Sequence, residues 1–265
     1  MAQPVTTVGP RGNQEPLLEG REVTKHFGGL VALSAVDFAV YPREIMGLIG
    51  PNGSGKTTLF DCLTRVQDLT EGSIYFKGED ITHKKPYQVA HMGLARTFQV
   101  IRVYRKLTVM ENMLLSRQWG RLSFLELFRP SGPKLKEKAR DLIHFLTLDH
   151  LSEERAGNLS GGQRRLLELG MALMSDPDLI LLDEATSGVN PTLTETIKDR
   201  IRELNEERGT TFLLVEHNMQ FIADLCSRIF VLNYGSKLAE GPPEALIEDE
   251  RVIEAYFGMD GVRHR

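Results

Sequence analysis

The sequence has little of what marks secreted or membrane-spanning proteins. Its only cysteines, Cys62 and Cys226, lie too far apart for a clustered metal site, so we expect two free thiols in a reducing compartment. No apolar run reaches the roughly 18 residues that a bilayer-crossing helix needs. The first sixteen residues lack the apolar centre of a signal peptide. These absences predict a soluble, cytoplasmic protein with a loose tail at residues 1–16.

An excess of charge of one sign is also lacking. The 265 residues carry a formal net charge of −4, which gives no general attraction to nucleic acid or to acidic lipid. We therefore expect no nucleic-acid partner, and we interpret the basic cluster at residues 102–106 as a solvated face. Hydrophobic residues make up 41% of the chain, enough to bury a sizeable core.

Strand and helix patterns alternate along the chain. Residues 17–49 and 72–82 alternate apolar and polar side chains between Gly and Pro, as antiparallel strands do. Helical patterns follow from about residue 90 to 150, and apolar strands resume at 178–184 and 210–217. This order predicts an α/β fold with a mainly parallel sheet covered on both faces. We expect one domain at 17–260, with an N-terminal antiparallel β subdomain and a helical subdomain inserted at about 100–170.

One motif predicts a phosphate-binding loop. The sequence GPNGSGKTT, at 50–58, matches G-x-x-x-x-G-K-[ST] in full and stands between an apolar strand and a helix, so the core is that of a P-loop NTPase. Its glycines let backbone N–H groups turn toward a phosphate, Lys56 can reach the β- and γ-phosphates, and the Thr57 hydroxyl can bind Mg²⁺. The alternative is an ordinary Gly-rich turn. The predicted nucleotide-binding residues are Gly50, Asn52, Gly53, Ser54, Gly55, Lys56, Thr57 and Thr58.

Two carboxylates follow the apolar strand in LILLDE. We predict that Asp183 holds the magnesium ion and that Glu184 orients or deprotonates the attacking water. The alternative is a plain exposed Asp-Glu pair. His217 follows another strand directly and is a further catalytic residue, since its imidazole could donate to the γ-phosphate. Gln99, in TFQ, is predicted both as a catalytic residue and as a magnesium ligand.

Five motifs stand in a fixed order: GPNGSGKTT, TFQ, LSGGQ, LILLDE and EH. Together they resemble the nucleotide-binding subunit of an ABC transporter over roughly residues 17–258. The resemblance implies ATP hydrolysis with Mg²⁺ in a head-to-tail dimer with a second ATPase subunit, identical or homologous. It implies that Ser160 and Gly162, with Gly161 and Gln163 of the same motif, bind the partner's ATP. It also implies that Phe27 stacks on adenine, although Phe27 could equally be a core aromatic.

The LSGGQ motif also has the pattern of a helix start. Ser160 and Gln163 match a capping box, and Leu166, Leu169 and Leu173 recur at helical spacing, so one face can be buried. The N-terminal N–H groups of such a helix attract anions. Because the chain already has a complete phosphate loop, this second anion site need not serve its own nucleotide.

Three further segments resemble a narrower group, the ATP-binding subunits of importers for branched-chain amino acids, urea and short amides. They are GLARTFQVIRVYRKLTVMENM, SGVNP with Asn190, and VIEAYFG. The resemblance implies integral membrane permease subunits, indirectly a solute-binding protein, and a peripheral position on the inner face of the cell membrane. Residues 96–111 are expected to face the permease; packing inside the helical subdomain is the alternative.

Two other functions remain open at this stage. A soluble, non-transport ABC ATPase of the translation type would carry two cassettes, and one of the repair type would carry long coiled coils. This chain has one cassette and no sustained heptads. A regulatory cassette that binds ATP without hydrolysing it is the other possibility, and the intact Lys56, Asp183, Glu184 and His217 argue against it.

Overall fold

The structure is a computed structural model that describes residues 14–97, 103–116 and 132–257. The chain divides into two compact units. The first contains the described residues up to 86 and from 211 onward, and the second is Tyr87–Thr210.

The first unit begins with an antiparallel sheet. Its strands are β1 (Leu18–Phe27), β2 (Leu30–Val40), β4 (Glu71–Phe76) and β5 (Glu79–Asp80), in the order β2-β1-β4-β5. Buried and exposed residues alternate along parts of β2, as expected for strands with one face on a core. The antiparallel β region predicted at the N-terminus is therefore confirmed.

The parallel strands of the first unit carry the predicted phosphate loop. β3 (Ile45–Ile49) pairs in parallel with β8 (Thr211–Val215) and with β9 (Arg228–Asn233), and β10 (Ser236–Gly241) completes a hairpin with β9. All five residues of β3 and of β8 are buried, which explains why both read as continuous apolar runs.

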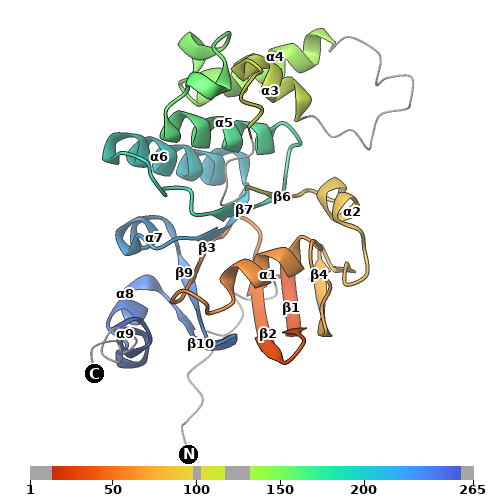
Figure 1. Cartoon of the computed structure of the whole chain (residues 1–265), viewed down its shortest axis with the longest axis vertical. Coiled ribbons are helices and arrows are strands. Elements are labelled where there is room, and N and C mark those ends of the chain that lie inside the picture. Colours follow the sequence, from red (N-terminus) through yellow and green to blue (C-terminus); the bar gives the residue numbers. More distant parts are fainter. Residues whose placement is uncertain (1–13, 98–102, 117–131, 258–265) are drawn as a thin grey trace, which may run out of the picture. The chain divides into compact units, whose positions relative to one another are not determined.

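Short helices complete the first unit. α1 (Lys56–Leu63) contacts β2, and α7 (Met219–Leu225) follows β8. At the C-terminus α8 (Pro243–Ile247) and α9 (Glu250–Phe257) contact each other and β10, as the blue end of the chain in Figure 1 shows. The two helices are separated by Glu248 and Asp249.

The second unit is largely helical. Its helices are α2 (Pro86–His91), α3 (Val109–Leu115), α4 (Pro133–Phe145), α5 (Gly161–Leu173) and α6 (Pro191–Arg208), with short 3₁₀ turns at Asp149–Leu151 and Ala156–Asn158. In Figure 1, α3, α4 and α5 pack together, and α6 lies against α5. None of the helices in the described ranges combines the length and apolar character needed to cross a bilayer.

One strand of the second unit was not predicted. Helical patterns were expected from about residue 90, but β6 (Leu94–Arg96) is a strand that pairs in parallel with β7 (Leu179–Asp183). Three residues are too short to show a periodicity, so the pairing with β7 decides their conformation. β6 leads directly into the TFQ segment, so its pairing with β7 sets where that segment begins.

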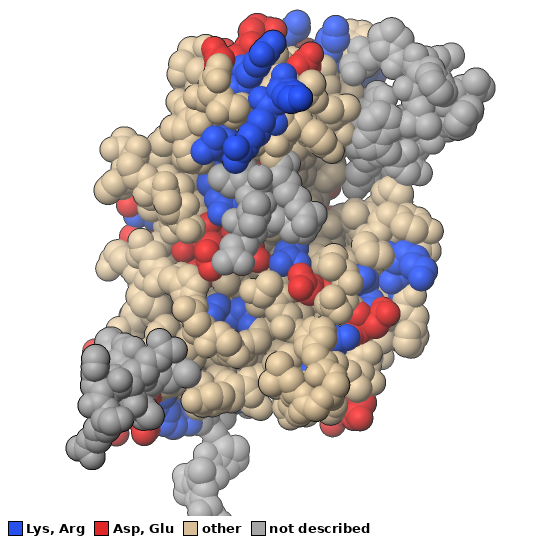
Figure 2. All heavy atoms as spheres, viewed as in Figure 1, with Lys and Arg blue, Asp and Glu red and all other residues tan. Residues whose placement is uncertain are grey.

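Charges of both signs share the surface of the second unit. Figure 2 shows Lys and Arg side chains gathered over its helices, with Asp and Glu side chains beside them. On α4, Lys134, Lys136 and Arg140 are exposed together with Glu137. A surface groove of about 460 Å³ beside α3 and α4 is lined by Lys136 and Arg140 but also by acidic residues of the following turn.

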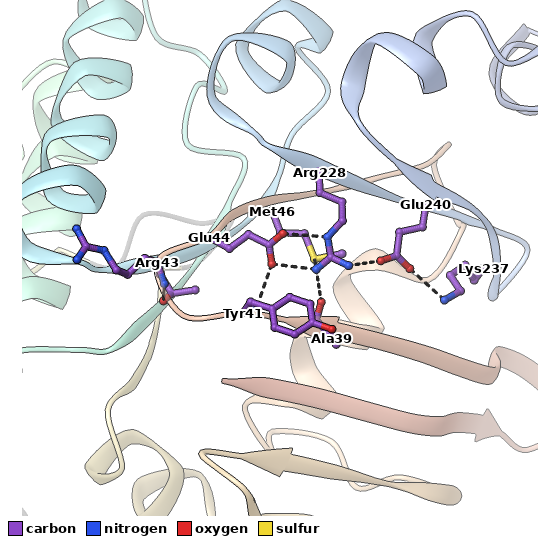
Figure 3. Close-up of polar contacts among 9 residues, drawn as sticks. Ala39, Tyr41, Arg43, Glu44, Met46, Arg228, Lys237 and Glu240 are labelled. Carbon is purple, nitrogen blue, oxygen red and sulfur yellow. Dashed lines mark hydrogen bonds and ion pairs between the residues drawn. The ribbon is translucent and has the colours of Figure 1, made fainter. Parts of the chain in front are cut away.

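Arg228 ties together four parts of the first unit (Figure 3). Its Nε and Nη2 donate to the two Glu44 carboxylate oxygens at 2.9 Å each, Nη2 also donates to the carbonyl of Ala39, and Nη1 pairs with Glu240. Glu44 further accepts from the Tyr41 N–H at 2.9 Å. Burial alone would lower the pKa of Arg228, but the hydrogen bonds and charge of Glu44 together with the charges of Glu240 and Tyr41 outweigh it and raise the pKa. The guanidinium therefore stays charged and joins the starts of β3 and β9 to β2 and β10.

Candidate nucleotide site

Three glycines set the path of the phosphate loop. Gly50, Gly53 and Gly55 have φ values of 152°, 82° and 105°, which side-chain-bearing residues rarely adopt. A Cβ on Gly50 would lie 2.1 Å from the backbone oxygen of Leu232, and one on Gly55 would lie 2.6 Å from that of Ala32. Gly50 and Gly55 are therefore required sterically by the fold, and Gly53 is favoured by its positive φ.

The loop ends on a helix whose N-terminus suits an anion. Gly55 is the N-cap of α1 and supplies no side-chain hydrogen bond, and the first turn carries no acidic side chain. Lys56 is buried, and its Nζ donates to the Gly50 and Pro51 carbonyls at 2.6 and 3.0 Å. The Ser54 hydroxyl is buried and finds no hydrogen-bond partner among the described residues. Thr57 is exposed at the same end of the helix.

His217 lies at the same edge of the first unit's sheet. β3 and β8 run in parallel with Leu48 opposite Val215, so the residues that follow both strands emerge at one edge. Those residues are Gly50 on one side and His217 on the other. His217 is exposed, and its backbone N–H donates to Glu216 at 3.3 Å. His217 and the phosphate loop thus follow neighbouring strands at one edge of the sheet.

Phe27 is not a core residue. It ends β1, 45% of its surface is exposed, and the Lys25 ammonium lies 4.8 Å from its ring centroid. The alternative that Phe27 is a core aromatic is therefore wrong, because its ring lies at the surface.

The second unit carries the two predicted carboxylates. Asp183 is the last residue of β7 and is buried, and its backbone N–H donates to Thr97 at 3.4 Å. Arg96 donates from Nη2 to Asp183 Oδ2 at 3.1 Å, and both side chains are buried. The sequence pattern did not predict a role for Arg96. The signal for Arg96 is weak in the sequence because it depends on the pairing of β6 with β7.

Glu184 stands directly after the strand in a strained backbone conformation. Its φ is 51°, in the left-handed region that residues other than Gly, Asn and Asp seldom occupy. The side chain is half-buried. Because strained backbone persists only where the surrounding structure enforces it, the turn after β7 fixes the backbone of Glu184.

The LSGGQ segment opens α5 as predicted. The Gln163 N–H donates to the Ser160 hydroxyl at 3.3 Å and the Ser160 N–H donates to the Gln163 side chain at 2.8 Å, which completes the capping box. Leu166, Leu169 and Leu173 are buried at helical spacing. Ser160 itself is exposed, and a hydroxyl that accepts one hydrogen bond can still donate its own proton.

The two glycines of this motif differ in their surroundings. A Cβ on Gly162 would lie 2.5 Å from a Leu193 methyl group and 3.0 Å from Val189, whereas one on Gly161 would meet only the Gly188 carbonyl at 3.3 Å. Gly162 is thus required by packing against the start of α6. Gln99 and the neighbouring residues 98–102 lie outside the described residues.

Comparison with known proteins agrees with these arrangements. The model of the ABC transporter family matches residues 33–187, more than half of the chain. The chain belongs to the ABC transporter family. A second model, described as branched-chain amino acid ATP-binding cassette transporter, matches residues 236–258, which comprise β10, α8 and α9.

Similar ABC proteins cover nearly the whole chain. A probable branched-chain amino acid transport ATP-binding protein LivG of Archaeoglobus fulgidus is 39% identical, over 91% of this chain and 95% of the relative. The high-affinity LivG protein of Escherichia coli K12 is 37% identical, over 92% and 98%. The crystal structure of an ABC transporter cassette in its ADP conformation is 36% identical, with a TM-score of 0.83, over 92% and 99%. The predicted P-loop NTPase fold and the ATPase class are therefore confirmed.

Proposed function

We propose that this ABC protein is the ATP-hydrolysing subunit of an importer for branched-chain amino acids or related small amides, working through separate membrane subunits. The observation that carries the proposal is the match of residues 236–258 to the branched-chain model. Identity of 37–39% to two LivG proteins over more than nine-tenths of the chain supports it.

The first unit fits the phosphates of ATP. Its loop offers a buried Ser54 hydroxyl that finds no hydrogen-bond partner among the described residues, an open position at Gly53 with no described atom within 4 Å of a Cβ, and a helix N-terminus whose first turn has no acidic side chain. We propose that Lys56 exchanges its two carbonyl contacts for the β- and γ-phosphates. Gly50, Asn52, Gly53, Ser54, Gly55, Thr57 and Thr58 form the rest of this surface, and Phe27 stacks on the adenine.

The donor set fits Mg²⁺, which keeps several waters and needs few protein oxygens. A single buried carboxylate, Asp183, and a single exposed hydroxyl, Thr57, meet that requirement. We propose that these two residues and Gln99 hold the ion, which would supply charge neutralisation at the phosphates. Within the second unit, the positive charge of Arg96 pairs with the Asp183 carboxylate.

Glu184 and His217 complete the proposed chemistry. The half-buried Glu184 carboxylate accepts a proton from water as a general base, and its fixed backbone keeps the carboxylate in place. The exposed His217 donates a hydrogen bond toward the γ-phosphate from the same sheet edge as the phosphate loop.

The capped start of α5 is the reason to propose a second copy. Ser160, Gly161, Gly162 and Gln163 form a capped helix start with an exposed Ser160, and helix starts attract anions, in a chain that already has a phosphate loop. We propose that they bind the nucleotide held by a second ATPase subunit, identical or homologous. In such a head-to-tail dimer the same pair of surfaces meets twice.

Mixed dimers test this arrangement. Lys56→Ala damages the loop, and Ser160→Arg blocks the approach of the capped helix start to a phosphate. In a mixed dimer both lesions fall on one composite site, and the other site keeps an intact loop and an intact Ser160. Mixing two inactive proteins should restore up to about half of the ATPase activity if the sites act independently. If both motifs served one nucleotide within one chain, every site would carry a lesion and no activity would return.

The membrane side of the transporter should contact residues 96–111. Tyr104 is 59% exposed, which is unusual for an aromatic ring that packs a core, and its backbone is fixed because its N–H donates to the buried Asn112 side chain at 2.8 Å. We propose that this segment, at the start of a helical subdomain of about residues 100–170, meets the permease on the inner face of the membrane. Tyr104→Ala should then leave basal ATPase activity intact and impair coupled uptake.

Substrate class is tested by reconstitution with the permease and solute-binding subunits. Uptake of labelled leucine, isoleucine and valine into vesicles is compared with uptake of urea and short amides, with Glu184→Gln as the inactive control. ATP-dependent uptake of either group, lost in the control, supports the proposal. A protein that hydrolyses ATP but does not associate with membrane subunits would instead be a non-transport ABC ATPase.

A further inference from the structure

The C-terminal helix reaches the phosphate loop. The backbone N–H of Gly50, the first residue of the loop, donates to the Tyr256 hydroxyl at 2.7 Å. Tyr256 lies on α9, and both residues belong to the first unit. Burial raises the pKa of Tyr256, so the phenol stays protonated near neutral pH.

The peptide of Gly50 is held from two directions. Its N–H is bound by Tyr256, and its carbonyl accepts from Lys56 Nζ at 2.6 Å. A side chain is also excluded at position 50, because a Cβ there would lie 2.1 Å from the backbone oxygen of Leu232. Of these restraints, the one from Lys56 is lost when its ammonium turns to a phosphate. Among the described residues, Tyr256 then supplies the side-chain hydrogen bond that remains on this peptide.

The helix that carries Tyr256 is itself anchored. Val252 and Ala255 on α9 are buried, and the helix contacts α8 and β10. Its start is fixed by Asp249, whose carboxylate accepts from the Arg251 N–H at 2.9 Å. A hydroxyl on a well-packed helix is a more rigid partner for Gly50 than water, because its position is set before any ligand arrives.

We propose that Tyr256 is a positioning residue for nucleotide binding, and that α9 holds the start of the phosphate loop in its binding conformation. The inference rests on the proposed role of residues 50–58. It gives a function at the nucleotide site to the segment that matches the branched-chain model. Because the loop binds phosphates before any bond is broken, loss of the contact should affect binding more than turnover.

Tyr256→Phe in the full-length protein removes one oxygen and keeps the ring. The dissociation constants of ATP and ADP, and the KM of ATP, should rise about fivefold, as expected for the loss of one hydrogen bond, with kcat within about twofold of the starting value. Tyr87→Phe is the matched control, because Tyr87 is 62% exposed on α2, outside the first unit's loop. It should change none of these quantities.

A second measurement does not depend on catalysis. Hydrogen exchange of a peptide that covers residues 49–55, without nucleotide, should be faster in Tyr256→Phe than in the unchanged protein and in Tyr87→Phe. A purely structural role would lower the melting temperature of Tyr256→Phe and leave nucleotide affinity and loop exchange unaltered, and that result would overturn the inference.

Lys56→Ala distinguishes a failure of the inference about Tyr256 from a failure of the proposed nucleotide site. If it loses nucleotide binding while Tyr256→Phe binds normally, the inference about Tyr256 is wrong and the proposed nucleotide site stands. If Lys56→Ala also binds with unchanged affinity, the proposed site is wrong and the inference about Tyr256 fails with it.

Discussion

Arg96 and Asp183 form a buried ion pair at the end of β7, with Arg96 Nη2 3.1 Å from Asp183 Oδ2 and side chains that are 6% and 2% exposed. The acid is the proposed magnesium ligand, and the base comes from the strand that leads into the TFQ segment. A buried carboxylate without a cation is costly. Arg96 therefore offsets part of the cost of burying the Asp183 carboxylate.

Replacing Arg96 by Met should lower the free energy of unfolding by about 3–5 kcal/mol, because it leaves the Asp183 charge buried without this partner. Denaturation by urea measures the change. The double variant Arg96→Met/Asp183→Asn should recover much of the loss, since the remaining amide is neutral. Equal destabilisation in the single and double variants would show that the ion pair contributes little.

Glu184→Gln should retain ATP binding and lose turnover by about 10²-fold or more, because an amide cannot take a proton from water. Single-turnover phosphate release measures the rate. The bound ATP should also stabilise a dimer, visible by size-exclusion chromatography. Hydrolysis near the normal rate in this variant would contradict the role of Glu184 as the general base.

Gly50→Ala and Gly53→Ala form a matched pair in the phosphate loop. A Cβ at Gly50 collides with a backbone carbonyl at 2.1 Å, whereas one at Gly53 meets no atom within 4 Å. Gly53→Ala should cost only the backbone strain of a positive φ, about 1–2 kcal/mol of stability. Gly50→Ala should cost more and abolish nucleotide binding, as measured by thermal melting and ATP titration. Similar losses in both variants would contradict the steric argument.

Arg228→Met should destabilise the protein by about 3–5 kcal/mol, because Glu44 is left buried without its bidentate partner. The control is Arg21→Met. Arg21 pairs with Glu19 at 2.9 Å, but its side chain is 57% exposed and screened by solvent, so the loss should be much smaller. Chemical denaturation of both variants compares them, and equal losses would refute the importance of burial.

Stability should fall at alkaline pH. Burial raises the pKa of the Cys62 thiol from 9.0 to about 11, so the folded chain holds a proton that the unfolded chain releases. The contribution is fully present below pH 9 and is lost as the pH rises toward about 11, at up to about 1.4 kcal/mol per pH unit. Cys62→Ala should flatten this slope in denaturation curves between pH 8 and 11. An unchanged slope would exclude Cys62 as a cause.

Local chemistry in the sequence was sufficient for several parts of the structure. The phosphate loop needs glycines and a Lys-Thr pair at fixed spacing, and the capping box needs Ser160 and Gln163 three residues apart. Both can therefore be predicted from the sequence without knowledge of tertiary contacts. The buried strands β3 and β8 were legible as apolar runs for the same reason. The family followed from the order of such local motifs.

Contacts between distant residues could not be read in this way. β6 is too short to have a period of its own and exists because β7 lies beside it, and the Arg96–Asp183 pair depends on that pairing. Tyr256 meets Gly50 across 206 positions of the sequence, because α9 packs on the first unit. The sequence by itself determined which residues can bind phosphate and cap helices, since those properties belong to short segments. Only the tertiary structure decided which side chains hold those segments in place, since that depends on which surfaces the folded chain buries together.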